Sequence, residues 1–242
     1  MMTSLLLNKL RINILLLLFA LTQLTQAQEP KATIDFGGEL TNRYVWRGLN
    51  LTRSPGVHPY IELTTGNWLF GTWGTYTFEK SPYQEVDLYV SYTAGIFNFT
   101  LFDYFVASDS LMVNGNYFDY SSLDSPHAIE AILTISDIPD LPITFTAATF
   151  IFGNDYNSEG DRAFSTYLEL GYDFAIGDQP LYTFAGVTTH EGLYADGFKC
   201  TNIGLSTSKD FTITENLSIP LTASLILNPD AENLFLILGL SF

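Results

Sequence analysis

The stretch that decides the fold is Glu85-Val86-Asp87-Leu88-Tyr89-Val90-Ser91-Tyr92. Its apolar residues occupy every second position, and most of the residues between them are polar. Successive side chains of a β-strand point to opposite faces, so this period of two predicts a strand with one apolar and one polar face.

The same alternation recurs along the chain, most clearly in residues 165–174 and in the last residues, 234–242. Helical periodicity is hard to find, and no run after Gln28 approaches the length of an apolar helical span. Counting the alternating segments gives about twelve strands of roughly ten residues each. We expect them at residues 33–47, 57–65, 68–78, 84–94, 96–106, 127–136, 142–152, 163–175, 180–189, 198–208, 217–227 and 234–242.

The connections between these segments alternate in length. Long polar connections, such as residues 48–56 and 107–126, alternate with tight turns, such as Gly66-Asn67 and Gly95. Long loops at one end and short turns at the other are typical of outer-membrane barrels, in which strands must close on themselves because lipid cannot satisfy backbone groups. The pattern predicts an all-β protein, a transmembrane antiparallel up-and-down β-barrel of about 12 strands, with roughly 10–14 as the range.

A soluble β-sandwich or a lipocalin-like barrel is the alternative. Three features weigh against it. Sandwich strands are usually shorter, at about five or six residues. Charged residues lie on the face that a small soluble barrel would fill with apolar groups. Finally, Phe242 ends the chain on an alternating apolar strand. We interpret Phe242 as the signal that such barrels present to the barrel assembly machinery.

The first 27 residues have the pattern of a signal peptide. Lys9 and Arg11 precede an apolar run at 12–21, and Thr25 and Ala27 place small residues before a cleavage point. The apolar run is too short for the roughly 20 residues of a spanning helix. We therefore expect a signal peptide at 1–27, a barrel domain at 28–242, and a location in the bacterial outer membrane, surrounded by its lipid.

Composition excludes several classes of protein. The 242 residues are 15% aromatic and 15% charged, which argues against a disordered chain. The net charge of −16 makes the chain a poor partner for nucleic acid. The single cysteine, Cys200, cannot form an internal disulfide, and no cluster has zinc-ligand spacing. We expect no cofactor and no metal.

If the apolar faces meet lipid, the charged faces line the interior. The polar positions of the first segment include Arg43 and Arg47, opposite Tyr44 and Trp46. The residues predicted to line the pore are Glu39, Arg43, Arg47, Glu62, Glu85, Asp87, Glu130, Glu169 and Asp173. Two interpretations stay open. The charges form either a salt-bridge network that closes a narrow barrel, or a constriction that selects ions. In an open pore the excess of carboxylates favours cations.

The three tryptophans lie near the ends of predicted strands. Trp46, Trp68 and Trp73 are therefore expected in the aromatic girdles at the membrane surfaces, although aromatic residues are also common in ordinary strands.

At Thr41-Asn42-Arg43-Tyr44-Val45-Trp46-Arg47-Gly48 the chain resembles the opening strand of the TorF-type porin family. Pro59, the run Asn67-Trp68-Leu69-Phe70-Gly71-Thr72-Trp73-Gly74 and the segment at 85–89 continue the resemblance, which is best over residues 35–105. Arg47 and the Tyr44/Trp46 pair fall on the family's pattern. The resemblance implies an outer-membrane barrel with a porin role and identifies no substrate.

These patterns predict a porin-like channel for small solutes or ions, and not an enzyme. The first alternative is a lipid-modifying hydrolase at the extracellular rim. Its candidates are the histidines His58, His127 and His190, with Ser54, Ser125, Thr189 and Asp124 nearby. The same histidines as a metal site, or Asp155, Glu159 and Asp161 as a loose calcium site, lack ligand spacing.

The second alternative is a closed structural or adhesive barrel. The 107–126 connection carries Tyr117, Phe118 and Tyr120, which would either constrict the interior or face a partner.

Overall fold

The computed structural model describes residues 31–242, apart from residues 107–115, 121–124 and 216. The predicted signal peptide and Asp124 lie outside the described residues. The chain divides into two units, Met1–Ala32 and Thr33–Phe242, and every strand described below belongs to the second. No helix within the described residues is long and apolar enough to cross a membrane.

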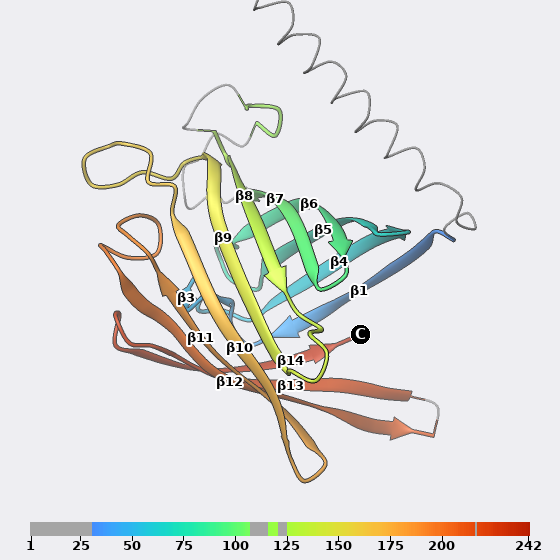
Figure 1. The fold of residues 1–242 in the computed structure, drawn as a ribbon. Coiled ribbons are helices and arrows are strands. Elements are labelled where there is room, and N and C mark those ends of the chain that lie inside the picture. Colours follow the sequence, from blue (N-terminus) through green and yellow to red (C-terminus); the bar gives the residue numbers. More distant parts are fainter. Residues whose placement is uncertain (1–30, 107–115, 121–124, 216) are drawn as a thin grey trace, which may run out of the picture. The chain divides into compact units, whose positions relative to one another are not determined.

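The second unit is a closed antiparallel barrel (Figure 1). Neighbours in the sequence are neighbours in the wall, and the last strand pairs with the first, as an up-and-down barrel requires. The prediction of an all-β barrel of about twelve strands is confirmed. The wall consists of β1 (Thr33–Thr41), β4 (Gly56–Thr65), β5 (Trp68–Thr77), β6 (Gln84–Ala94), β7 (Phe97–Val106), β8 (His127–Ile135), β9 (Ile143–Gly153), β10 (Thr166–Ile176), β11 (Gln179–Thr188), β12 (Lys199–Thr214), β13 (Leu217–Asn228) and β14 (Asn233–Ser241).

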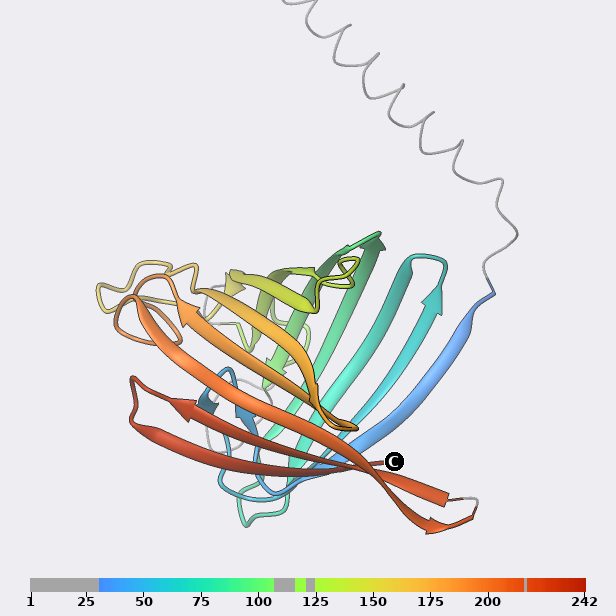
Figure 2. The same ribbon diagram turned by 60° about the horizontal axis from the view of Figure 1, so that its bottom comes forward.

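Most predicted strands match the observed bounds to within a few residues, and two differ more. β12 runs on to Thr214, and its hairpin with β13 projects from the wall (Figure 2). The first strand was predicted to reach Arg47, but β1 ends at Thr41. The following residues leave the wall and form a separate hairpin of β2 (Val45–Trp46) and β3 (Leu49–Asn50).

The wall has the opposite burial pattern to a soluble protein. On β6, the apolar Val86 and Leu88 are 48% and 44% exposed, whereas Glu85 and Asp87 are 4% and 1% exposed. The outward positions of β14, Leu234, Leu236 and Leu238, are likewise exposed. The alternation in the sequence therefore becomes an apolar outer face and a polar inner face.

Closure of the barrel depends on a short seam. β1 pairs with β14 through Glu39, Leu40 and Thr41, and Gly38 exchanges two backbone hydrogen bonds with Phe242 just beyond β14, whereas β1 pairs with β4 over its whole length. Beyond Thr41 the side chain of Asn42 continues the pairing. Its Nδ2 donates to the carbonyl of Leu236 (3.0 Å), and its Oδ1 accepts from the amide of Leu238 (2.9 Å). Asn42 thus satisfies part of the β14 edge at the point where the chain turns inward.

Candidate functional site

The β2–β3 hairpin turns at Arg47 and Gly48, which both have positive φ angles (50° and 80°). Two successive positive φ angles are the requirement of a type I′ hairpin turn. The turn packs against the inner side of the wall, because a Cβ on Gly48 would lie 1.8 Å from the carbonyl oxygen of Thr201. Asn228 also donates from Nδ2 to the Gly48 carbonyl (3.1 Å). The hairpin therefore reaches β12 and β13 from the inside.

Arg47 holds the hairpin to the other side of the barrel. Its Nη1 donates to Glu130 Oε1 (2.5 Å) and its Nη2 to Glu130 Oε2 (3.0 Å), which is a bidentate ion pair. Glu130 is fully buried and also accepts hydrogen bonds from the hydroxyls of Tyr104 (2.8 Å) and Tyr194 (3.1 Å). Burial acts to lower the pKa of Arg47, but Tyr194 and Glu130 together raise it above its usual value, so the guanidinium stays charged. We call this group, Arg47, Glu130, Tyr104 and Tyr194, the latch.

Aromatic rings enclose the latch. The Arg47 guanidinium carbon lies 4.6 Å from the ring centre of Trp46 and 4.8 Å from that of Tyr167, within the range of cation–π attraction. Trp46 packs against Tyr104, Tyr194 and Phe150. The expectation of Trp46 at a membrane surface is thus wrong. Its strand has left the wall, so the ring lies inside the barrel.

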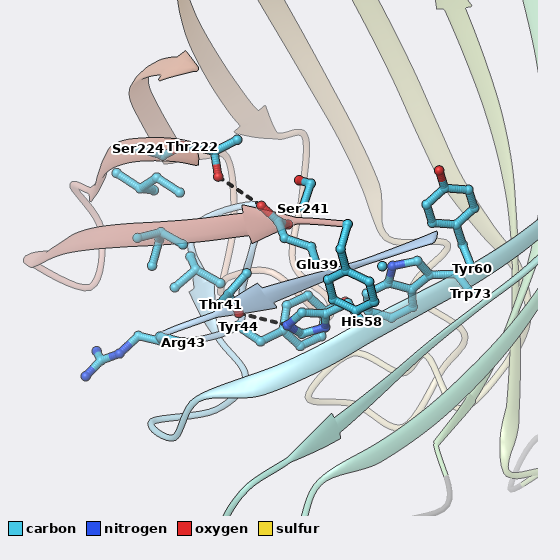
Figure 3. Close-up of a pocket in the computed structure, with 15 residues that line it drawn as sticks. Glu39, Thr41, Arg43, Tyr44, His58, Tyr60, Trp73, Thr222, Ser224 and Ser241 are labelled. Carbon is cyan, nitrogen blue, oxygen red and sulfur yellow. Dashed lines mark hydrogen bonds between the residues drawn. The ribbon is translucent and has the colours of Figure 1, made fainter. Parts of the chain in front are cut away.

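A cavity of about 520 Å³ lies inside the wall between the β1–β4–β5 side and the β13–β14 side (Figure 3). Glu39 is hydrogen-bonded there by the Thr222 hydroxyl (2.9 Å), and the His58 Nε2 by Thr41 (2.8 Å). The further polar groups that line it include Arg43, Tyr60, Ser224 and Ser241. This interior space can therefore hold water and small polar solutes.

Trp73 also lies at this cavity and stacks on His58, with ring centres 5.5 Å apart. Its predicted position in an outer girdle is therefore wrong, because the alternation of β5 turns it inward. Trp68, by contrast, is 46% exposed beside Tyr92 and Phe70.

Tyrosine hydroxyls also donate to other inward carboxylates. Tyr89 donates to Glu62 (2.6 Å) and Tyr83 to Glu85 (3.0 Å). Glu169 accepts from Tyr167 and from Asn202 Nδ2 (3.0 Å). Asp87 accepts from the amide of Phe105 (3.3 Å), and Asp173 lies exposed near the short turns. The predicted pore-lining carboxylates thus occupy inward positions of their strands, and most of them are held by hydrogen bonds.

The two arginines have different surroundings. Arg47 is part of the latch, whereas Arg43 lines the larger cavity and has its guanidinium carbon 5.5 Å from the ring centre of Phe235. Figure 3 shows Arg43 pointing away from Glu39. Arg47 is therefore part of a buried ion pair, whereas Arg43 lies on the wall of the larger cavity.

A second cavity of about 280 Å³ lies on the loop side of the hairpin. Side chains of the hairpin segment, Tyr44, Trp46, Leu49 and Leu51, form one side of it. Tyr104, Phe150 and Glu85 from the wall lie on the other side. Its lining is mostly apolar and aromatic, in contrast to that of the larger cavity.

The histidines have structural partners. His127 Nδ1 lies 2.9 Å from Asp103 Oδ1, and its Nε2 lies 2.6 Å from the carbonyl oxygen of Tyr117. His190 Nε2 donates to the carbonyl of Ala163 (2.7 Å). No group of three or more His, Cys, Asp or Glu that could hold a metal is found within the described part of the chain.

Loop residues also cover part of the outer wall. Tyr120 stacks on His127 at 4.0 Å and donates to Asp103 (2.7 Å), while Tyr117 packs on Phe105. The described part of the 107–126 connection therefore lies against β7 and β8.

Phe242 is 65% exposed, and its backbone is hydrogen-bonded to Gly38.

Sequence reasoning missed the tyrosines of the latch. Tyr104 alternates inward on its strand and could have been chosen from the pattern, as could Tyr167, which lies beside the latch. Tyr194 lies in the 190–197 connection, and no periodicity indicates that it reaches Glu130.

Comparison with known proteins gives no family. No protein-family model matches the chain, and no curated protein matches it. A solved structure of a mutant of the Rh. blastica porin aligns with 88% of this chain and 99% of its own, with 11% identity and a TM-score of 0.35. What this barrel does must therefore be inferred from its own residues.

Proposed function

We propose that the barrel lies in the bacterial outer membrane and conducts small solutes or ions passively, with a preference for cations. The observation that carries this proposal is the inverted wall: exposed apolar residues outside, and carboxylates inside. An apolar outer face suits lipid, and a closed barrel leaves no unpaired strand edge there. The resemblance to TorF-type porins agrees with this function.

The preference for cations follows from the inner charges. The inward carboxylates outnumber the inward arginines, and Glu130 already neutralises Arg47. A negative potential in a narrow passage concentrates cations and excludes anions. Glu39 and Arg43 on the larger cavity then contribute to the selection of solutes.

The test is single-channel conductance of the refolded mature protein in a planar bilayer, with a salt gradient to measure selectivity. Steady steps with a reversal potential that favours cations support the proposal. Steady anion-selective steps would contradict the charge argument, and a folded barrel that stays silent would contradict the channel.

A closed barrel is the second candidate, because the latch holds the hairpin across the interior. It predicts a silent wild-type protein that conducts only when the hairpin is removed.

For the histidines we propose structural roles. We therefore expect no lipid hydrolysis above background by the wild type, and no change in the variants His58→Ala, His127→Ala and His190→Ala. If the wild type does hydrolyse lipid and one of these substitutions abolishes that activity, the hydrolase becomes the better interpretation.

A further inference from the structure

The smaller cavity combines aromatic walls with a buried carboxylate. Trp46, Leu49, Tyr104 and Phe150 supply apolar surface, and Glu85 is 4% exposed among them. Its volume of about 280 Å³ equals that of roughly nine water molecules in the liquid. Such a space is matched by a small organic molecule rather than by one ion.

Glu85 has a neighbouring carboxylate and no cationic partner. Asp87 lies two positions along the same face of β6 and is 1% exposed. Ion pairs within the described residues involve neither group, since Arg47 is engaged with Glu130. Opposite Glu85 on β5, the buried hydroxyl of Thr75 has no hydrogen-bond partner among the residues that the structure describes.

A buried carboxylate without an opposite charge is costly, and a bound cation removes that cost. Aromatic faces also attract cations, and more strongly when water is excluded. An inorganic cation would leave the apolar walls of the cavity unfilled. A compact amine with an apolar body satisfies both the carboxylate and the walls.

We propose that this cavity is a binding site for small organic ammonium ions, with the ammonium group at Glu85 and the apolar body between Trp46, Leu49 and Tyr104. The site goes beyond the proposed channel function, because binding requires only the folded barrel and its hairpin.

The test uses the refolded mature protein in non-ionic micelles at neutral pH, with phenethylamine as the probe and phenethyl alcohol as its neutral counterpart. Isothermal titration should show binding of the amine, with the alcohol about tenfold weaker or undetectable. Equal binding of the two compounds, or no binding of the amine, would overturn the site.

Two variants locate the site. Glu85→Gln should weaken amine binding about tenfold, because it removes the charge and keeps the shape. Glu62→Gln is the matched control, since Glu62 is also an inward carboxylate held by a tyrosine hydroxyl but does not line this cavity, and it should bind as the wild type does. If the two substitutions weaken amine binding equally, the amine is attracted by the overall negative charge of the barrel, and the site is refuted.

Ala128→Leu tests the cavity itself, because Ala128 lines it and a larger side chain reduces its volume. Heat-modifiable gel migration identifies the folded variants, and folded Ala128→Leu should lose amine binding. Unchanged binding by this variant would contradict the location. A conducting barrel that binds no amine would overturn this inference alone, whereas a silent barrel that binds the amine would overturn the channel alone.

Discussion

Gly48 determines whether the hairpin can dock. A Cβ at this position meets the Thr201 carbonyl at 1.8 Å, and the φ angle of 80° is unfavourable for any other residue. We predict that Gly48→Ala lowers the free energy of unfolding by about 2–3 kcal/mol. Gly95→Ala is the control, because it has a φ of 61° with no atom near its Cβ, and should cost only about 1 kcal/mol. Urea unfolding in lipid vesicles measures both, and equal losses would show that the hairpin does not pack as described.

The Arg47–Glu130 pair should behave as one unit. Arg47→Met leaves a buried carboxylate, and Glu130→Gln leaves a buried guanidinium, so each should destabilise the protein by about 3 kcal/mol. The double variant should lose less than the sum, with a coupling of about 1–3 kcal/mol. The free energies of unfolding of the four proteins give this coupling, and strict additivity would mean that the ion pair contributes nothing.

At the residue scale, alternation indicates the face of a strand on which a charged residue lies, but not the partner with which it pairs. Arg47 and Glu130 lie 83 positions apart, and no local pattern joins them. The inward tyrosines that bind the carboxylates follow from alternation, whereas Tyr194 comes from a loop. Trp73 shows the related limit, because aromatic residues occur on both faces of its strand, with Trp68, Phe70 and Tyr76 on the outward face.

At the scale of elements, Asn42 separates the wall from the hairpin. The alternation of residues 43–47 continues that of β1, so periodicity alone extends the strand. The turn residues Arg47 and Gly48 are also not the Asn-Gly pair that usually indicates a tight hairpin. Tertiary contacts of Trp46, Arg47 and Gly48 with residues distant in the sequence favour the inward fold.

The side chain of Asn42 should protect the edge of β14 at this point. Asn42→Ala removes the acceptor for the Leu238 amide, and we predict about tenfold faster hydrogen exchange of that amide, in line with the loss of one hydrogen bond. Asn98→Ala is the control, because Asn98 bonds to the side chains of Thr93 and Thr100 far from the seam. Exchange measured by mass spectrometry on the refolded protein checks this, and an unchanged Leu238 rate would show that the seam does not need Asn42.

At the scale of the whole molecule, the fold was predictable because one requirement acts on every strand. Each wall strand must place apolar groups outward and polar groups inward, and this leaves the same period of two in nearly every segment. The inner hairpin is free of that requirement, and the alternation of residues 43–47 therefore does not distinguish it from a wall strand.

The hairpin can be removed without cutting a wall strand, because Thr41 and Gly56 are paired neighbours on β1 and β4. Replacing residues 42–55 by Asn-Gly would join them with a two-residue turn. If the hairpin narrows the passage, this variant should conduct more than the wild type in a planar bilayer. Its cation preference should remain, because the loss of Arg43 and Arg47 leaves the wall carboxylates in place. Shortening the 156–162 connection, whose residues line neither cavity, is the control for loop removal and should leave the conductance unchanged. An unaltered conductance in the hairpin variant would mean that the permeation path does not pass the hairpin. If the conductance of the control variant rises as well, the cause is a loosened barrel and not the loss of the hairpin.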